Sequence, residues 1–212
     1  TGSDAGHVRV YQWSGGSWTQ LGPDIDGEAA GDFSGWSVAL SSDGTILAVG
    51  ARENDGTGTI AGHVRVHQWS GGSWTQLGPD IDGEAAGDRS GFSIALSSDG
   101  TILAVGAPFN DGTSSDMGHV RVYQFSSGSW TQLGSDIDGE AGSDYSGMSV
   151  SLSSDGTILA VDAIYKDGSK GRVRVYGWAG GSWTQLIGDI DGEAADDQSG
   201  YSISLSSDGT IL

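Results

Sequence analysis

The stretch GWSVALSSDGTILAVGA, residues 35–51, contains two short strand patterns joined by a tight turn. Its first half alternates small or polar residues with Val and Leu, and its second half is a short apolar run. Asp43-Gly44 lies between the halves and is a strong signal for a two-residue β-hairpin turn. The stretch therefore predicts two antiparallel strands, over residues 35–41 and 45–51.

Two further strand patterns follow at residues 63–69 and 73–81. HVRVHQW alternates and carries β-branched and aromatic residues, and SWTQLGPDI follows it across Gly71-Gly72, a second hairpin signal. No segment of the sequence shows a helical period. The unit therefore contains four antiparallel strands in chain order.

The same unit returns along the chain. SSDGTIL begins at Ser41, Ser97, Ser153 and Ser206, and GHVRV or GRVRV recurs at offsets of 56, 56 and 53 residues. Four strands in a period of this length match a β-propeller blade, with a solenoid coil as the alternative. We predict an all-β fold: a β-propeller-type array of four-stranded antiparallel blades, in about four quasi-repeats of 53–56 residues.

The expected division is a single repeat domain over residues 1–212. It has a partial blade at 1–34, blades at 35–90, 91–146 and 147–199, and a second partial blade at 200–212. Joining the two partial blades into a closed ring would leave out half a strand and a loop, and the ring would have unpaired strand edges. We therefore expect the partial blades to be completed within a longer tandem array or by a neighbouring chain, with a self-closed ring as the alternative.

The repeat resembles the FG-GAP repeat of integrin α-subunit propellers and their bacterial relatives, through SGWSVALSSDGTILAVGA and the GHVRVHQW that follows it. The resemblance extends over all four quasi-repeats. The FG position reads Ser-Gly in each repeat, as at Ser34-Gly35, and the GAP triplet is intact at Gly106-Ala107-Pro108. This resemblance implies a propeller whose FG element opens the innermost strand and whose ligand contacts come from loops on one face.

The chain is strongly acidic. It has 28 acidic and nine basic side chains, a formal net charge of −19, and no cysteine. Such a charge repels nucleic-acid phosphates, so we expect no nucleic-acid partner, and no apolar run is long enough to predict membrane insertion. The expected partners are other proteins or further copies of the chain, with carbohydrate as an alternative.

Four acidic loops repeat the motif DIDGEAAGD of residues 24–32 with small changes. Their alternating carboxylates fit ligand positions 1, 3 and 5 of an EF-hand-type calcium loop, but the glycine falls at position 4 instead of position 6. The family resemblance gives no support here, because integrin-like calcium loops lie between the FG and GAP strands, where this chain has only SSDG. Two interpretations stay open: structural hinges, in which Asp26 or Glu28 pairs with the strand arginine of its blade, or cation sites with Ca²⁺ as the cofactor. The candidate metal ligands are Asp24, Asp26, Glu28, Asp80, Asp82, Glu84, Asp136, Asp138, Glu140, Asp189, Asp191 and Glu193.

The loop after the second strand of each unit varies, whereas the framework hardly does. It spans residues 52–62, 108–118 and 164–171 and should emerge on the same face as the acidic loops. Variable loops on a rigid scaffold are typical binding surfaces, although neutral variation in solvent is the alternative. The candidate binding residues are Arg52, Asn54, Phe109, Asn110, Tyr165 and Lys166.

No motif in the sequence predicts catalysis. His7, His63 and His119 are repeat equivalents, and a catalytic base has no reason to recur three times. We therefore expect no enzyme and no catalytic residue. The leading interpretation is a non-catalytic extracellular or cell-surface module for adhesion or structural assembly, acting through its acidic loop face. The alternatives are a lectin-like propeller, which the eight tryptophans suggest, and a calcium-binding propeller segment of a larger surface protein.

Overall fold

A computed structural model describes residues 2–212 of the chain. It is built of β-strands, with one short helix, α1 (Lys166–Ser169), in the part described. No helix within residues 2–212 has the length and apolar character to cross a membrane. The all-β prediction is confirmed.

The first complete sheet follows the order expected from the hairpin signals. Its strands pair antiparallel in chain order, and a short fifth strand returns to pair with the start of the third. Asp43 closes the first hairpin because its Oδ1 accepts hydrogen bonds from Thr45 N and from Ser41 Oγ. The strands are β5 (Ser34–Leu40), β6 (Ile46–Ala51), β7 (His63–Ser70), β8 (Ser73–Gln76) and β9 (Ile81–Asp82).

Two further sheets repeat this topology. One contains β10 (Ser93–Leu96), β11 (Ile102–Ala107), β12 (His119–Ser126), β13 (Ser129–Gln132) and β14 (Ile137–Asp138). The other contains β15 (Val150–Leu152), β16 (Ile158–Asp162), β17 (Arg172–Ala179), β18 (Ser182–Gln185) and β19 (Ile190–Asp191).

The two ends of the chain carry shorter pieces of the same unit. β1 (His7–Val8) pairs with β4 (Ile25–Asp26), and β2 (Tyr11–Ser14) pairs with β3 (Ser17–Gln20). At the other end residues 200–212 contain no assigned strand, but they run beside β15. Ile203 N and Leu205 N donate hydrogen bonds to the hydroxyls of Ser149 and Ser151.

The hydrophobic core lies between neighbouring sheets. Leu47, Leu103 and Leu159 occupy the same position in successive second strands and are fully buried. A repeated tryptophan joins each sheet to the one before it: Trp130 Nε1 donates to Leu77 O at 2.9 Å, 53 residues back in sequence. The middle sheet packs against a neighbouring sheet on each of its faces, which explains how a chain of modest hydrophobic content forms a core.

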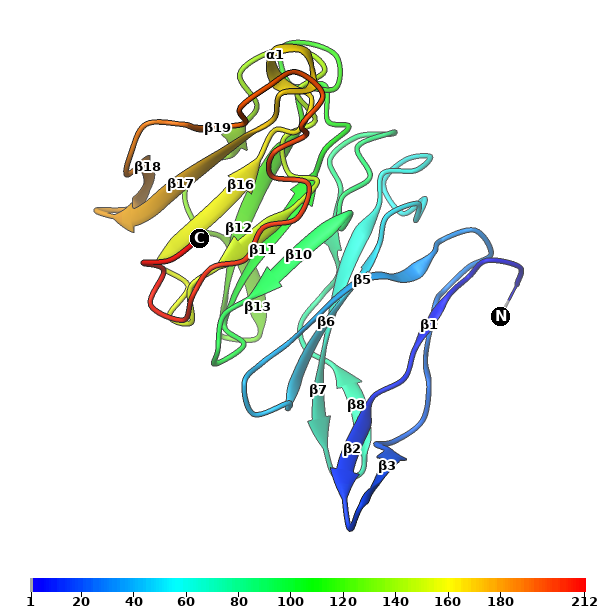
Figure 1. The fold of residues 1–212 in the computed structure, drawn as a ribbon. Coiled ribbons are helices and arrows are strands. Elements are labelled where there is room, and N and C mark those ends of the chain that lie inside the picture. Colours follow the sequence, from blue (N-terminus) through cyan, green and yellow to red (C-terminus); the bar gives the residue numbers. More distant parts are fainter. Residues whose placement is uncertain (1) are drawn as a thin grey trace.

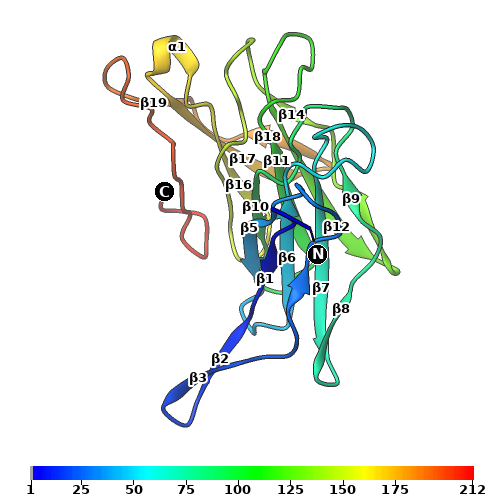
Figure 2. The same ribbon diagram turned by 90° about the vertical axis from the view of Figure 1, so that its right-hand side faces the viewer.

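The sheets are arranged side by side as a fan, with the N-terminal strands at one side and the C-terminal segment at the other (Figure 1). In the second view α1 and β19 lie at one end of the blades and the β2–β3 hairpin lies at the opposite end (Figure 2). We call the end that carries α1 the loop face. It is formed by residues 26–34, 52–62, 82–90, 108–118, 138–146, 163–171 and 191–199.

Candidate functional site on the loop face

Each acidic loop ends in an aspartate that holds the loop in place. Asp32, Asp88 and Asp144 are buried, and the Oδ2 atom of Asp88 accepts hydrogen bonds from Ala85 N (3.1 Å) and from Asn110 Nδ2 (3.0 Å). Asp32 forms the same pair of contacts with Ala29 N and Asn54 Nδ2. Buried carboxylates of this kind are costly unless hydrogen-bonded, so these bonds fix the loop to its blade.

Three of the predicted binding residues are the side-chain partners of these buried aspartates. Asn54 and Asn110 are buried, and their Oδ1 atoms also accept hydrogen bonds from the backbone of their own loops. Lys166 occupies the equivalent place in the third blade, where its Nζ lies 3.4 Å from Asp144 Oδ2. The variable loop therefore keeps a polar anchor at one position, and the structure gives Asn54 and Asn110 a structural role.

The strand arginines are paired, but not as the sequence predicts. Arg65 Nη1 lies 3.4 Å from Glu28, which belongs to the preceding acidic loop, and Arg65 Nη2 donates to Asp26 O at 2.8 Å. In two units the first aspartate of the loop, not the second, meets the arginine of its own unit: Arg9 and Asp24 at 2.9 Å, and Arg121 and Asp136 at 2.9 Å. The expectation that Asp26 or Glu28 pairs with the arginine of its own blade is wrong, because adjacent blades place each glutamate over the next strand.

Carboxylates of one acidic loop do not converge on a common point. Within residues 2–212, two groups of three possible ligand residues have their ligand atoms within 4.8 Å of one another. Each group takes its residues from two acidic loops and a strand: Glu28, His63 and Asp80 in one, Glu84, His119 and Asp136 in the other. Burial lowers the pKa of both histidines, so both imidazoles are neutral at pH 7.

The remaining predicted ligands are distributed among other contacts. Asp189 and Asp191 pair with Arg172, and Asp138 O accepts from Arg174. The second aspartate of an acidic loop pairs with the first residue of the third strand in the antiparallel sheet, as Asp82 does with His63. Glu193 has no ion pair among the described residues.

Aromatic side chains form a continuous row along the loop face. Trp36, Phe92, Phe109, Tyr145 and Tyr165 contact one another in this order, with ring centroids 5.6, 6.2, 5.2 and 5.2 Å apart. We call these five residues the aromatic ladder. Trp36 and Tyr165 at its two ends are 48% and 41% exposed, so the row is open to solvent.

Two arginines stack on the ladder. The guanidinium carbon of Arg52 lies 3.5 Å from the centroid of Trp36, and that of Arg89 lies 4.4 Å from the centroid of Phe109. These distances are within the range of cation–π attraction. The ladder therefore already binds guanidinium groups of its own chain.

The residue after the last aspartate of each acidic loop has a left-handed backbone in every repeat. Phe33, Arg89, Tyr145 and Gln198 have φ values of 53°, 55°, 52° and 50°. This conformation costs a non-glycine residue about 1–2 kcal/mol, so the surrounding hydrogen bonds must hold it. Backbone strain of this kind concentrates at functional sites, and two of these residues adjoin the ladder: Tyr145 is part of it and Arg89 stacks on Phe109.

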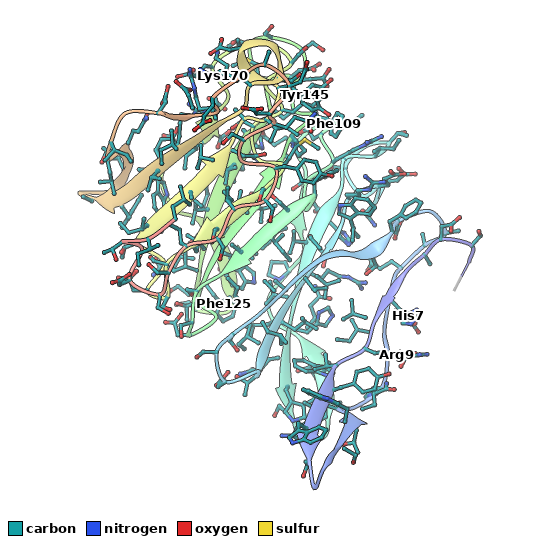
Figure 3. The ribbon with its side chains drawn as sticks, viewed as in Figure 1. His7, Arg9, Phe109, Phe125, Tyr145 and Lys170 are labelled. Carbon is teal, nitrogen blue, oxygen red and sulfur yellow. The ribbon has the colours of Figure 1, made fainter. Side chains whose placement is uncertain are left out.

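A pocket of about 430 Å³ opens beside the C-terminal half of the ladder. It is lined by Phe109, Ser143, Tyr145, Met148 and Tyr165. Figure 3 shows Phe109 and Tyr145 close together near α1, whereas Phe125 lies toward the opposite end of the sheet. Burial raises the pKa of the Tyr145 phenol, so it stays a neutral hydrogen-bonding group at the pocket wall.

The predicted binding residues thus divide into two groups. Arg52, Phe109 and Tyr165 belong to the ladder or stack on it, whereas the other three anchor loops. Sequence reasoning missed Trp36, Phe92 and Tyr145. Their signal was available, because the positions on either side of the invariant Ser-Gly pair vary among the repeats.

Comparison with solved structures supports the propeller fold. The chain matches a putative 6-phosphogluconolactonase from Bacteroides uniformis with a TM-score of 0.60 and 14% identity, over 89% of this chain and 50% of that one. It matches a second, from Bacteroides fragilis, with a TM-score of 0.56 and 15% identity, over 79% of this chain and 41% of that one. The chain spans about half the length of the first of these proteins. At such identities the likeness shows the fold alone.

These matches correct one expectation. The absence of catalytic motifs led us to expect no enzyme, but both of these structural relatives carry the name of an enzyme. Absence of a known motif does not exclude catalysis, because a propeller holds site residues on separate loops that no local pattern joins. The prediction that the chain is not an enzyme is therefore wrong, because the sequence gives no ground for excluding catalysis.

The family comparison points to the repeat itself. No curated protein sequence matches the chain. Residues 25–66 match the FG-GAP repeat family, and this region runs from β4 through the first two strands of the first complete sheet into β7. The chain is a repeat module that contains an FG-GAP repeat at residues 25–66.

Proposed function

We propose that the chain is an extracellular adhesion or assembly module that binds a basic segment of a partner protein on its loop face. The aromatic ladder carries this proposal. It extends across successive blades, is open to solvent at both ends, and has guanidinium groups stacked at two points.

Charge supports the same kind of partner. The acidic loops adjoin the ladder directly, since Asp144 precedes Tyr145 and Asp88 precedes Arg89, which stacks on Phe109. Glutamates 28, 84 and 140 are each more than 40% exposed. A ligand arginine would thus meet an aromatic face and a carboxylate together, which strengthens both interactions.

Carbohydrate is the second candidate because of the pocket beside Tyr145. Its three aromatic rings and the Ser143 hydroxyl could stack on and hydrogen-bond a sugar ring. The repeated tryptophans do not add to this candidate. Trp74, Trp130 and Trp183 donate their indole N–H groups to carbonyls of the preceding blade and serve as blade-to-blade contacts.

The test is binding of a fluorescent peptide of eight Arg-Gly units, measured by anisotropy. We expect binding to the wild type and at least about fivefold weaker binding to Tyr145→Ala, the loss of one cation–π contact of ~1 kcal/mol. Tyr201→Ala is the matched control, because Tyr201 is 70% exposed and makes no ring contact among the described residues. Equal affinities of both variants, or equal binding of a Glu-Gly peptide, would refute the proposal. A hit on a glycan array with no peptide binding would favour carbohydrate.

The extracellular location needs a separate test. Antibody labelling of intact and permeabilised cells of the source organism distinguishes surface display from an internal site. Signal only after permeabilisation would contradict the location without touching the binding result.

A further inference from the structure

Each boundary between neighbouring blades brings two acidic loops to the start of a third strand. At the boundary before β17 the strand residue is Arg172. Its guanidinium lies 2.8 Å from Glu140 Oε2, 2.8 Å from Asp189 Oδ2 and 2.7 Å from Asp191 Oδ1. This position therefore holds a cation among carboxylates of two loops.

Histidine takes the place of that arginine at the boundary before β7. His63 Nδ1 lies 3.9 Å from Glu28 Oε2 and 3.9 Å from Asp80 Oδ2. Both distances exceed a hydrogen bond, and neither ring nitrogen of His63 has a hydrogen-bond partner within residues 2–212. The side chain is nonetheless only 2% exposed, and its Nδ1 faces two carboxylates.

The second oxygen of each carboxylate already has a partner. Glu28 Oε1 lies 3.4 Å from Arg65 Nη1, and Asp80 Oδ1 accepts a hydrogen bond from Gln76 Nε2. Each side chain therefore turns its other oxygen toward the imidazole. Such outer partners orient the ligands of metal sites in proteins.

The two carboxylates that face His63 lack a full complement of positive charge from the protein. His63 stands where Arg172 stands at the boundary before β17, so this boundary lacks the guanidinium that pairs with the carboxylates there. Arg65 balances Glu28, but Asp80 has no arginine or lysine partner among residues 2–212. One imidazole nitrogen and two carboxylate oxygens form a common ligand set for Zn²⁺ and related divalent ions.

We propose that Glu28, His63 and Asp80 bind one divalent transition-metal ion, with Zn²⁺ as the reference ion, and so clamp the first acidic loop to the next blade. Two ligand atoms on a tetrahedral zinc lie about 3.4 Å apart, given bonds of about 2.1 Å. Glu28 and Asp80 are 46% and 32% exposed, so their side chains are free to close from 3.9 Å and solvent has access to the site.

The next boundary serves as an internal comparison. Glu84, His119 and Asp136 repeat the set, but Arg121 pairs with Glu84 and holds Asp136 through two hydrogen bonds of 3.0 and 2.9 Å. The arginine there supplies the positive charge to both carboxylates. Metal binding is therefore assigned to the first boundary and not to the second.

Calorimetric titration with ZnCl₂ on the whole chain tests this assignment. We expect one ion per chain, a higher melting temperature with zinc, and visible d–d absorption when Co²⁺ replaces it. His63→Arg, which copies Arg172, should abolish binding, and Asp80→Asn should weaken it at least about tenfold. His119→Arg is the matched control and should bind one zinc as the wild type does.

Circular dichroism checks that each variant is folded. If His63→Arg does not fold, the Asp80→Asn variant decides the question. No zinc binding below about 100 μM would overturn the proposal, since it is far weaker than protein zinc sites. Unchanged binding in folded His63→Arg or Asp80→Asn would overturn it too. Loss of binding in His119→Arg would contradict the choice of boundary. None of these outcomes depends on whether the loop face binds a basic peptide.

Discussion

Asp162 at the end of β16 is the most informative single position for stability. Gly50 and Gly106 occupy the same place in the first two sheets, where an added Cβ would collide with the carbonyl oxygen of the next blade. Asp162 is 0% exposed. Its Oδ1 accepts hydrogen bonds from Gly147 N at 3.1 Å and Ser149 N at 2.9 Å, but its buried Oδ2 has no partner among the described residues.

Burial of this carboxyl raises its pKa from 3.8 to about 7, against the opposing effect of the two backbone hydrogen bonds. Between about pH 4 and pH 7 the carboxyl of Asp162 is therefore protonated in the folded state and ionised in the unfolded state. Stability from this group is fully present below the unfolded pKa and is lost as pH rises through the folded pKa. Complete ionisation destabilises the fold by about 4 kcal/mol, at 1.36 kcal/mol for each unit of pKa difference.

Asp162→Asn removes the titration and keeps an acceptor for the two backbone N–H groups. We expect the free energy of unfolding of the variant to rise relative to wild type by about 3 kcal/mol more at pH 8 than at pH 5. Urea unfolding followed by tryptophan fluorescence at both pH values measures this difference. Because the other titrating groups are shared, they cancel in the comparison. Parallel pH profiles for the two proteins would refute the assignment.

Three other predictions concern separate contacts. Trp130→Phe loses the indole hydrogen bond to Leu77 O and should lower the free energy of unfolding by about 1 kcal/mol, whereas Trp13→Phe, at an indole 57% exposed, should change it by less than about half that amount in the same urea assay. Gln198→Gly relieves a φ of 50° and should stabilise the fold by roughly 0.5–1 kcal/mol; a lower melting temperature would show that the position is not strained. Millimolar CaCl₂ should raise the melting temperature no more than NaCl of matched ionic strength, because the carboxylates of one acidic loop contact different partners; a larger rise would restore the calcium interpretation.

The blade could be predicted from local sequence because its signals are local. Asp43-Gly44 and Gly71-Gly72 fix two hairpins, and the alternation of HVRVHQW fixes the strand between them. The period then fixes how often the unit occurs. None of these inferences needs knowledge of how one blade meets the next.

The contacts of the candidate sites depend on how neighbouring blades pack, and they were not predictable from the sequence. Glu28 reaches Arg65 and His63 of the following blade only because neighbouring sheets pack with a particular offset. The left-handed backbone at Phe33 and Tyr145 was equally hidden, since bulky aromatic residues rarely adopt it. The anchoring by Asn54 of a buried aspartate also joins two loops 22 residues apart in sequence.

The repeats separate the residues that hold blades together from those that face a ligand. Positions that form blade-to-blade contacts keep their chemistry in successive units, as Trp74 and Trp130 do. The left-handed position after the last aspartate of each acidic loop does not keep its chemistry. It is aromatic at Tyr145 and basic at Arg89, on the same strained backbone. A position that retains a costly conformation while its side chain changes has its backbone set by the fold and its side chain free for recognition. The differences along this one position are therefore where we expect the binding preference of the loop face to be determined.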